Sequence, residues 1–290
     1  MIESKNNPIA FQTSTKLGIS VMKKKILITG ATDGIGLATA KQLASQGHHL
    51  LIHGRNSEKL ATVKQQLLSE PNVGEVECYT ADLSKFNDIT KLIQAVTQQH
   101  STLDVLINNG GVFKIAQRQT DSGLDVRFMV NTIAPYLLMK GLTPLFCNTS
   151  RVVNLSSAAQ APVEVAAMQG KMQLDDMSAY AQSKLALTCW SHFIGVECAT
   201  TGPMVVAVNP GSMLNSKMVN EGFGVQGNDI EIGANILVEA SLTDRFNNAA
   251  GHYFDNDSQQ FSAPHSDAIN PQKAATILQF LTKVTDAHRV

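Results

Sequence analysis

The residues Thr29-Gly30-Ala31-Thr32-Asp33-Gly34-Ile35-Gly36 give the strongest indication of the fold of this chain. This stretch follows an apolar run at residues 26–29 and opens a segment of helical period at residues 34–46. Glycines at such a turn allow unusual φ angles and a close approach of a phosphate, and the helix N-terminus adds N–H donors. The stretch predicts a pyrophosphate site, although glycine-rich turns are also common where no ligand binds.

Apolar runs and helical segments alternate along the rest of the chain, which is typical of a parallel sheet covered by helices on both faces. We therefore expect an α/β fold with a doubly wound parallel sheet, the Rossmann fold. The expected strands are residues 26–29, 49–53, 76–80, 105–108, 151–155, 204–208 and 252–254. The expected helices are residues 34–46, 57–69, 87–99, 122–146, 178–199, 229–241 and 271–285.

The chain shows no Pro/Gly/Ser-rich linker and no internal repeat, so we expect one domain over residues 23–290. Residues 1–22 are polar and mixed, without the apolar core of a signal peptide or a membrane span. We interpret them as a flexible N-terminal extension, with a true start at Met22 as the alternative. Segments 160–177 and 211–228 look irregular and follow strands, which predicts substrate loops.

Composition indicates an ordinary globular protein that binds a small molecule. Of 290 residues, 43% are hydrophobic and 16% are charged, and the formal net charge of -1 argues against a nucleic-acid partner. The four cysteines show no CxxC or Cys/His ligand spacing, so we expect reduced thiols in the cytoplasm and no metal site. We expect neither membrane insertion nor secretion.

The glycine spacing points to one family. Gly30, Gly34 and Gly36 follow the pattern Gly-x-x-x-Gly-x-Gly rather than Gly-x-Gly-x-x-Gly. With Thr29 before it, this stretch resembles the motif of short-chain dehydrogenases/reductases, and the long segment between Ser157 and Tyr180 is similar to the retinol-dehydrogenase-like branch. The resemblance implies dinucleotide contacts from six loop residues: Gly30, Thr32, Asp33, Gly34, Ile35 and Gly36.

The end of the second expected strand bears on the choice of coenzyme. It reads His53-Gly54-Arg55-Asn56, where an NAD site usually offers an acidic residue. The Arg55 fork instead suits a 2′-phosphate, and we expect Asn56 beside it. Asp33 adds an opposing negative charge, and a solvated surface arginine is the alternative reading. We expect NADP(H), with NAD(H) less favoured.

Two further motifs are implied to contact the coenzyme. Asp82-Leu83 matches the family pair that holds adenine, and an N-cap of the next helix is the other reading of Asp82. Asn109-Gly110-Gly111 resembles the end of the family's Asn-Asn-Ala-Gly, which stabilises the sheet against the cofactor. Glycine replaces the usual alanine at Gly110, which we expect to cost local rigidity.

A third motif follows the sixth expected strand. Pro210-Gly211, with Ser212 after it, matches the family's Pro-Gly turn beside the nicotinamide. Asn215 or Ser216 replaces the threonine that relatives direct at the carboxamide.

The segment Tyr180-Ala181-Gln182-Ser183-Lys184 carries the expected chemistry. Tyr180 and Lys184 lie one turn apart on the same face of a helix. A nearby ammonium lowers the pKa of a phenol, ordinarily about 10, so Tyr180 can exchange protons with a substrate oxygen. On its own such a pair is more often an amphipathic surface pair.

The resemblance adds Ser157 and Asn131 to the catalytic set. Ser157 is the second serine of the family's Asn-x-Ser-Ser pattern, which hydrogen-bonds the substrate oxygen, although strand-end serines are often turn residues. Asn131 matches the asparagine that kinks a long helix and holds a water for proton relay. A helix-interior asparagine bonded to a neighbouring carbonyl is the alternative.

These motifs predict an oxidoreductase (EC 1.1.1.-) that moves a hydride between NADP(H) and the carbonyl or alcohol group of a small, apolar substrate. The alternative is a non-catalytic NADP(H)-binding redox sensor or scaffold, and an epimerase or dehydratase would need a longer C-terminal part. Relatives form dimers or tetramers through helices like 122–146 and 178–199, so a homo-oligomer is expected. Met213, Met218, Phe223 and Val225 predict an apolar lid over the site, and ordinary core packing is the alternative reading.

Overall fold

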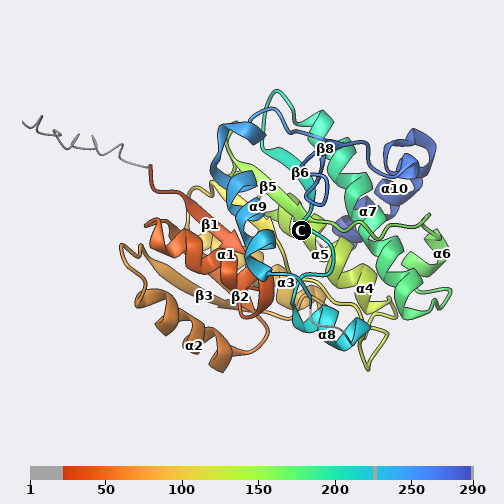
Figure 1. The fold of residues 1–290 in the computed structure, drawn as a ribbon. Helices are drawn as coiled ribbons and strands as arrows, with labels where there is room; N and C mark the ends of the chain where they lie inside the picture. Colours follow the sequence, from red (N-terminus) through yellow and green to blue (C-terminus); the bar gives the residue numbers. More distant parts are fainter. Residues whose placement is uncertain (1–21, 225–226, 289–290) are drawn as a thin grey trace, which may run out of the picture.

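The eight strands of the described chain form one sheet in the order β3-β2-β1-β4-β5-β6-β7-β8 (Figure 1). The computed structural model describes residues 22–224 and 227–288. Strands β1 to β7 run parallel and β8 pairs with β7 in the antiparallel sense. The strands are β1 Lys25–Ile28, β2 His49–Gly54, β3 Val76–Thr80, β4 Val105–Asn108, β5 Arg151–Leu155, β6 Met204–Asn209, β7 Tyr253–Asp255 and β8 Gln260–Ser262.

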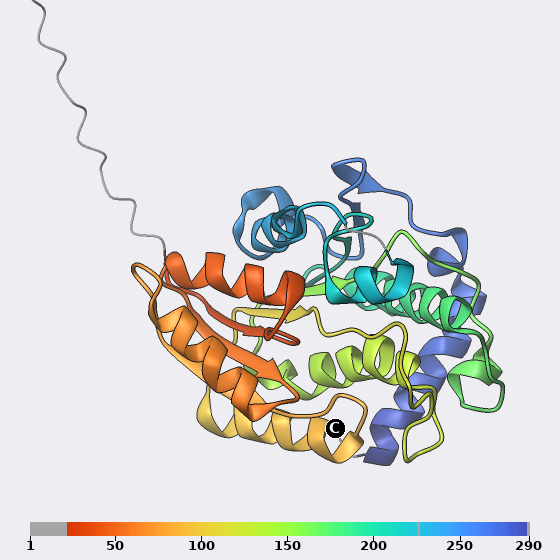
Figure 2. The same cartoon turned by 60° about the horizontal axis from the view of Figure 1, so that its bottom comes forward.

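Helices cover both faces of this sheet (Figure 2). Side chains alternate along a strand, so in β1 Leu27 belongs to the buried core that contains residues of α3, α5, α7 and α10, whereas Ile26 and Ile28 belong to the core that contains residues of α1, α2 and α9. The helices are α1 Gly34–Ser45, α2 Ser57–Leu68, α3 Phe86–Gln99, α4 Val126–Phe128, α5 Ala134–Gly141, α6 Val165–Met168, α7 Asp176–Glu197, α8 Lys217–Phe223, α9 Ile230–Leu242 and α10 Pro271–His288. The doubly wound α/β prediction is confirmed.

The strand order reverses between β1 and β4. From β1 the chain winds outward to β2 and β3, then crosses back to place β4 on the other side of β1. Loops that follow β1 and β4 therefore diverge, and this leaves a crevice at their carboxyl ends. The glycine loop, Arg55, Asp82, Asn109 and Pro210 each follow the carboxyl end of a strand, whereas Tyr180 and Lys184 lie on α7.

Several expected elements were wrong in extent. The helix expected over 122–146 begins only at Val126, is widened by a π segment at Met129–Ile133, and ends at Gly141 before a 3₁₀ turn at Thr143–Leu145. Gly123, at φ +79°, turns the chain before it. The segments expected to be irregular contain α6 and α8, and the sequence analysis missed β8, a three-residue edge strand with two exposed residues.

The expected strands 76–80, 105–108 and 151–155 match β3, β4 and β5 at both ends. The remaining boundaries agree to within three residues, a spread that is common at helix and strand ends. The first strand stops before Thr29 and the last parallel strand begins after His252. The expected N-terminal extension, apart from Met22, lies outside the described residues. Within the described part, no helix combines the length and the apolarity needed to cross a lipid bilayer.

A buried arginine joins α4 to the start of α7. The Arg127 side chain is fully buried, and its Nε and Nη2 donate to the two carboxylate oxygens of Asp125 at 2.9 and 2.6 Å. Its Nη1 donates to Asp176 Oδ1 at 2.5 Å, in the first turn of α7. These bonds hold the pKa of Arg127 above its ordinary value, although burial opposes them. The guanidinium therefore ties the first turn of α7 to the segment around α4.

We expect Arg127→Leu to lower the free energy of unfolding by about 3 kcal/mol, because it leaves the partly buried carboxylate of Asp125 without its cation and that of Asp176 with only the half-exposed Arg118. Urea denaturation measures this change. The matched control is Arg118→Leu, which removes a half-exposed partner of the same Asp176 (3.2 Å) and should cost less than about 1 kcal/mol. Equal losses in the two variants would contradict this account of Arg127.

Candidate active site

A cavity of about 400 Å³ opens at the carboxyl ends of β1 and β4. It collects residues that the sequence analysis took from separate segments of the chain. The predicted site residues that line it are Gly30, Thr32, Asp33, Gly34, Ile35, Arg55, Asp82, Leu83, Asn109, Gly110, Gly111, Tyr180, Lys184 and Pro210. The predicted residues outside its lining are Gly36, Asn56, Asn131, Ser157, Gly211 and Ser212.

The glycine loop is packed so tightly that side chains are excluded from two positions. Gly30 has φ +66°, and a Cβ there would lie 2.8 Å from Gly110 Cα. A Cβ on Gly36 would lie 2.3 Å from Gly30 O. Asn109 fixes this arrangement, because its Nδ2 donates to the carbonyls of Thr29 at 2.9 Å and Gly30 at 3.0 Å. Gly36 thus acts beneath the loop rather than at the cavity wall.

The carboxylate of Asp33 has a local partner. Asp33 is the N-cap of α1, and its Oδ1 accepts from Gly34 N at 2.7 Å. Its negative charge lies at the positive end of the α1 dipole, which favours it there. The carboxylate is exposed and borders the cavity.

Arg55 stands at the end of β2 with an exposed side chain that borders the cavity. It also borders a second cavity of about 380 Å³, together with Asp82 and Lys85. Asn56 has a different place: its Oδ1 accepts from Lys59 N at 2.8 Å and caps α2. The structure therefore brings Arg55, and not Asn56, to the cavity.

His53 is a site residue that the sequence analysis missed. The imidazole is 2% exposed; its Nδ1 faces Gly30 N at 3.3 Å and its Nε2 faces Ala81 O at 3.0 Å. Since Nδ1 must accept and Nε2 must donate, the ring is the neutral Nε2–H tautomer. Burial lowers the pKa of His53 to about 4. His53 thus joins the glycine loop to the end of β3, and only its place at a strand end could have signalled this.

Asp82 was wrongly offered as a helix N-cap. The N-cap of α3 is Lys85, while Asp82 Oδ1 accepts from the N and Oγ of Ser84 at 2.9 and 2.8 Å in a local turn. The carboxylate remains at the cavity. Gly110, the departure from the family pattern, donates its N–H to Thr29 Oγ1 at 3.0 Å, and a Cβ there would stand 3.2 Å from Leu83. Alanine would need its neighbours to shift here.

Tyr180 and Lys184 extend from α7 into the cavity, as the four-residue spacing predicts. Lys184 is 5% exposed; its Nζ donates to Leu155 O at 2.7 Å and lies 5.7 Å from the Tyr180 ring centroid. Ser157, at the end of β5, makes a side-chain hydrogen bond with Tyr180. The Ser156 hydroxyl is bonded instead to Thr188 Oγ1 at 2.6 Å. The three predicted groups therefore meet.

The expected lowering of the Tyr180 pKa was wrong. Burial raises the pKa of Tyr180, and the Ser157 hydrogen bond opposes that rise only in part. The ammonium of Lys184 is directed at the Leu155 carbonyl rather than at the phenol oxygen. Burial also lowers the pKa of Lys184 to about 8. The phenol is accordingly held in its protonated form at neutral pH.

Asn131 occupies the middle of the π segment. Its Oδ1 accepts from Val112 N at 2.8 Å, and its Nδ2 donates to Val112 O and to Ser183 Oγ, both at 3.0 Å. The widened turn at Met129–Ile133 interrupts the regular α-helical hydrogen bonding around Asn131. A Cβ on Gly111 would lie 3.4 Å from Asn131 Oδ1 and 3.6 Å from Lys184 Nζ, so the amide and the ammonium stand close together.

The loop after β6 is tied down by polar contacts. Gly211 has φ +116°, and Asn256 Nδ2 donates to Pro210 O at 2.8 Å. Ser212 N and Oγ both donate to Asp257, at 2.7 and 2.6 Å, which directs Ser212 away from the cavity. Ser216 lines the cavity and caps α8.

Of the other residues predicted to contribute from this loop, some line the cavity and others do not. Asn215 does not line the cavity and accepts from Asn220 Nδ2 at 3.1 Å. Of the expected apolar lid, Met218 lines the cavity, whereas Met213 is 39% exposed outside it. Val225 and the Phe223 side chain lie outside the described part.

Two aromatic residues beside Tyr180 were also missed. The Phe113 ring packs edge-on against Tyr180 with centroids 5.2 Å apart, and Phe113 lines the cavity. Tyr253, from β7, donates its hydroxyl to Ser157 O at 3.2 Å. Neither residue belongs to a motif, so only the tertiary structure reveals them.

Comparison with known proteins gives the same picture. A family model described as short chain dehydrogenase matches residues 24–223. The chain is 30% identical to polyprenol dehydrogenase of Homo sapiens over 254 residues, 80% of this chain and 77% of that protein. It is 26% identical to retinol dehydrogenase 13 of Homo sapiens, over 84% of this chain and 80% of that one.

Solved structures agree. A protein from Mycobacterium paratuberculosis described as uncharacterized has the same fold, with a TM-score of 0.75 and 23% identity over 91% of this chain and 93% of that one. A metagenomic short-chain oxidoreductase, solved in complex with NADP, is 26% identical at a TM-score of 0.59, over 77% and 93% of the two chains. The family match, the sheet and the cavity lead to one conclusion: this chain belongs to the short-chain dehydrogenase/reductase family and is an NAD(P)-dependent oxidoreductase.

Proposed function

We propose that the chain transfers a hydride between NADP(H) and the carbonyl or alcohol carbon of a small, apolar substrate, with Tyr180 as general acid and base. The observation that carries this proposal is that Tyr180 and the buried Lys184 line the same cavity as the glycine loop. Ser157, just outside that lining, makes a side-chain hydrogen bond with Tyr180. One site therefore holds the acid/base group Tyr180, the cation Lys184 and the glycine loop for the phosphates.

The cavity fits a dinucleotide. The exclusion of Cβ atoms at Gly30 and Gly36 leaves backbone N–H groups at the start of α1 for a pyrophosphate. Asp82, Leu83, Asn109 and Gly110 line the adjoining wall, where we place the adenosine half. Pro210 lines the wall after β6, where we place the nicotinamide.

When bound, the nicotinamide supplies or accepts the hydride. In the reducing direction, Ser157 and Tyr180 donate hydrogen bonds to the carbonyl oxygen, and Tyr180 gives its proton to the alkoxide as it forms. The raised pKa of Tyr180 keeps that proton in place until the oxygen gains charge. Lys184 holds the ribose with its ammonium, and Asn131, beside it, belongs to the path that returns the proton.

Arg55 supports NADP(H) over NAD(H). Its exposed guanidinium borders the cavity at the end of β2, where it can pair with a 2′-phosphate in a bidentate manner. The competing charge of Asp33 is already bonded to Gly34 N at the N-terminus of α1. The metagenomic relative solved with NADP adds support.

The cavity lining supports an apolar substrate. Val112, Phe113, Ile115 and Met218 line the same cavity as Tyr180 and present carbon surface to it, and the Phe113 ring packs against Tyr180. The names of two relatives, polyprenol dehydrogenase and retinol dehydrogenase 13, denote apolar alcohols. A homo-oligomer and a cytoplasmic location stay predictions.

Tyr180→Phe should lower kcat by at least about 100-fold, because it removes the proton donor and leaves the ring in place. Activity is followed as NADPH absorbance with a panel of aldehydes, ketones and alcohols, and NADPH binding is measured by fluorescence. Tyr136→Phe, a change within the core packing of α5, is the control and should keep its activity. Near-normal turnover by Tyr180→Phe would refute the acid/base role. A wild-type protein that binds NADPH but turns over no substrate would support the sensor alternative.

Arg55→Ala should weaken NADPH binding by roughly 10- to 100-fold and change NADH binding little, since only the phosphate contact is lost. Dissociation constants for both coenzymes measure the effect. Lys59→Ala, an exposed cation one turn into α2, is the matched control and should leave both constants unchanged. A wild-type preference for NADH would contradict the role of Arg55.

Lys184→Met should raise the free energy of unfolding at pH 7 in the coenzyme-free protein. The pKa of Lys184 is about 8 when folded and about 10.5 when unfolded, so the unfolded chain binds the extra proton between these values. The wild type therefore gains stability as pH rises from 8 to 10.5 and bears the full cost of the buried charge below pH 8. That cost is about 3 kcal/mol. The gain in stability from Lys184→Met is smaller than this, because the substitution also removes the hydrogen bond to Leu155 O.

Urea denaturation at pH 7 and pH 10 tests this expectation. The stability difference between Lys184→Met and the wild type should shrink at the higher pH. Lys171→Met, at an exposed lysine before α7, should show a difference that does not change with pH. A pH-independent difference at Lys184 would show that its pKa is not depressed.

A further inference from the structure

The opposite edge of the sheet carries a polar cluster that the oxidoreductase reaction does not use. His49 begins β2, Glu75 precedes β3 and Glu77 lies within β3. Leu51 pairs with Glu77 in the parallel register, so alternation places His49, Glu75 and Glu77 on the same face. They lie at the amino ends of these strands, whereas the cofactor cavity lies at the carboxyl ends.

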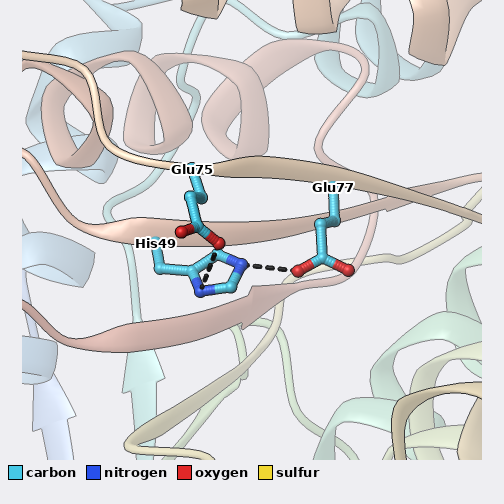
Figure 3. Close-up of side chains that lie close together, drawn as sticks. All are labelled: His49, Glu75 and Glu77. Atoms are coloured by element: carbon cyan, nitrogen blue, oxygen red, sulfur yellow. Dashed lines mark hydrogen bonds and ion pairs between the residues drawn. The ribbon is translucent and has the colours of Figure 1, made fainter. Parts of the chain in front are cut away.

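The imidazole of His49 lies between the two carboxylates (Figure 3). Its Nε2 is 2.6 Å from Glu77 Oε1 and its Nδ1 is 3.6 Å from Glu75 Oε2. One ligand atom from each residue can be chosen so that all three lie within 4.8 Å of one another. The side chain of Glu75 is 79% exposed, so it can swing toward a shared ion without repacking the core.

A second layer of hydrogen bonds orients Glu77. Tyr79 Oη donates to Glu77 Oε2 at 3.0 Å, and His100 Nε2 lies 3.4 Å from the same oxygen. Lys25 Nζ donates to His100 Nδ1 at 3.0 Å, so the proton of that ring is on Nε2, toward Glu77. Donors thus converge on one oxygen of Glu77 and leave Oε1 directed at His49. Carboxylates that ligate metals are commonly held by such outer bonds.

We propose that His49, Glu75 and Glu77 bind a divalent transition-metal ion, with Zn²⁺ as the best match. One imidazole nitrogen and two carboxylate oxygens form a donor set that Zn²⁺ accepts, with a fourth position for water. The ion takes the place of the proton between His49 Nε2 and Glu77 Oε1, and that proton leaves to solvent. These two atoms must separate from 2.6 Å to about 3.3 Å, the edge of a tetrahedron with bonds of about 2.0 Å.

The bound ion would join β2 to β3 on the side remote from the coenzyme. Its effect is therefore on the stability of this edge of the sheet and not on the hydride transfer. Sequence spacing could not reveal this site, because His49 is separated from the two glutamates by a helix and a loop. It becomes visible only when the parallel strands pair.

Zn²⁺ titration of the full chain without a polyhistidine tag tests the site by calorimetry. We expect one ion per chain, with binding weakened more than about 10-fold by His49→Ala and by Glu77→Gln. Glu75→Gln changes an exposed side chain and keeps the fold intact, so its loss of affinity is the decisive result. His252→Ala removes an exposed histidine elsewhere on the surface and should bind as the wild type does.

Co²⁺ substitution separates this site from a thiol site. Coordination by His49 and the glutamates gives visible d–d bands without a thiolate charge-transfer band. Tyr79→Phe should weaken binding by roughly 10-fold because it removes one of the two donors that orient Glu77. Three results would overturn the proposal. They are a thiolate band, an affinity that survives both His49→Ala and Glu75→Gln, and no binding by the wild type. The last result would show that the cluster is an ion-pair network only.

Discussion

Two hydrogen bonds from the Asn109 side chain to the carbonyl oxygens of Thr29 and Gly30 join the loop after β1 to the end of β4. These strands flank the point where the strand order reverses, and the Asn109 bonds add to the pairing of β1 with β4 and to the bond from Gly110 N to Thr29 Oγ1. The contact leaves no volume for a side chain on Gly36, whose Cβ would lie 2.4 Å from Asn109 Nδ2. The shape of the coenzyme cavity depends on this packing, and the catalytic residues are built around it.

Much of the architecture could be predicted because it rests on short-range patterns. Buried parallel strands appear as apolar runs, and the helices between them repeat at 3.6 residues, so the order of elements followed from the chain alone. Because Tyr180 and Lys184 are four residues apart, their side chains lie on the same face of a helix, and this does not depend on the rest of the fold. Their approach to Ser157 then followed from the parallel sheet, which brings strand ends to one edge.

What could not be predicted depends on contacts between distant segments. The π segment around Asn131 could not be recognised from the sequence. Both faces of that helix are buried, so no pattern of apolar and polar residues reveals a change in its period. The raised pKa of Tyr180 reflects burial and the direction of the Lys184 ammonium, which helix spacing does not determine. Nothing in the local sequence marks Arg127, whose charge is buried against Asp125, the N-cap of α4, and Asp176, in the first turn of α7.

The neutral imidazole of His53 makes the glycine loop part of the protein's response to acid. The pKa of His53 is about 4 in the folded chain and 6.5 in the unfolded chain. Between these two pH values the unfolded chain binds a proton at His53 and the folded chain does not. The stability that His53 contributes is complete above pH 6.5 and is lost as the pH falls through 4, at a cost of about 3 kcal/mol. Protonation would also place a donor against Gly30 N–H, so acid would weaken the fold at the turn where the coenzyme's phosphates are expected to bind.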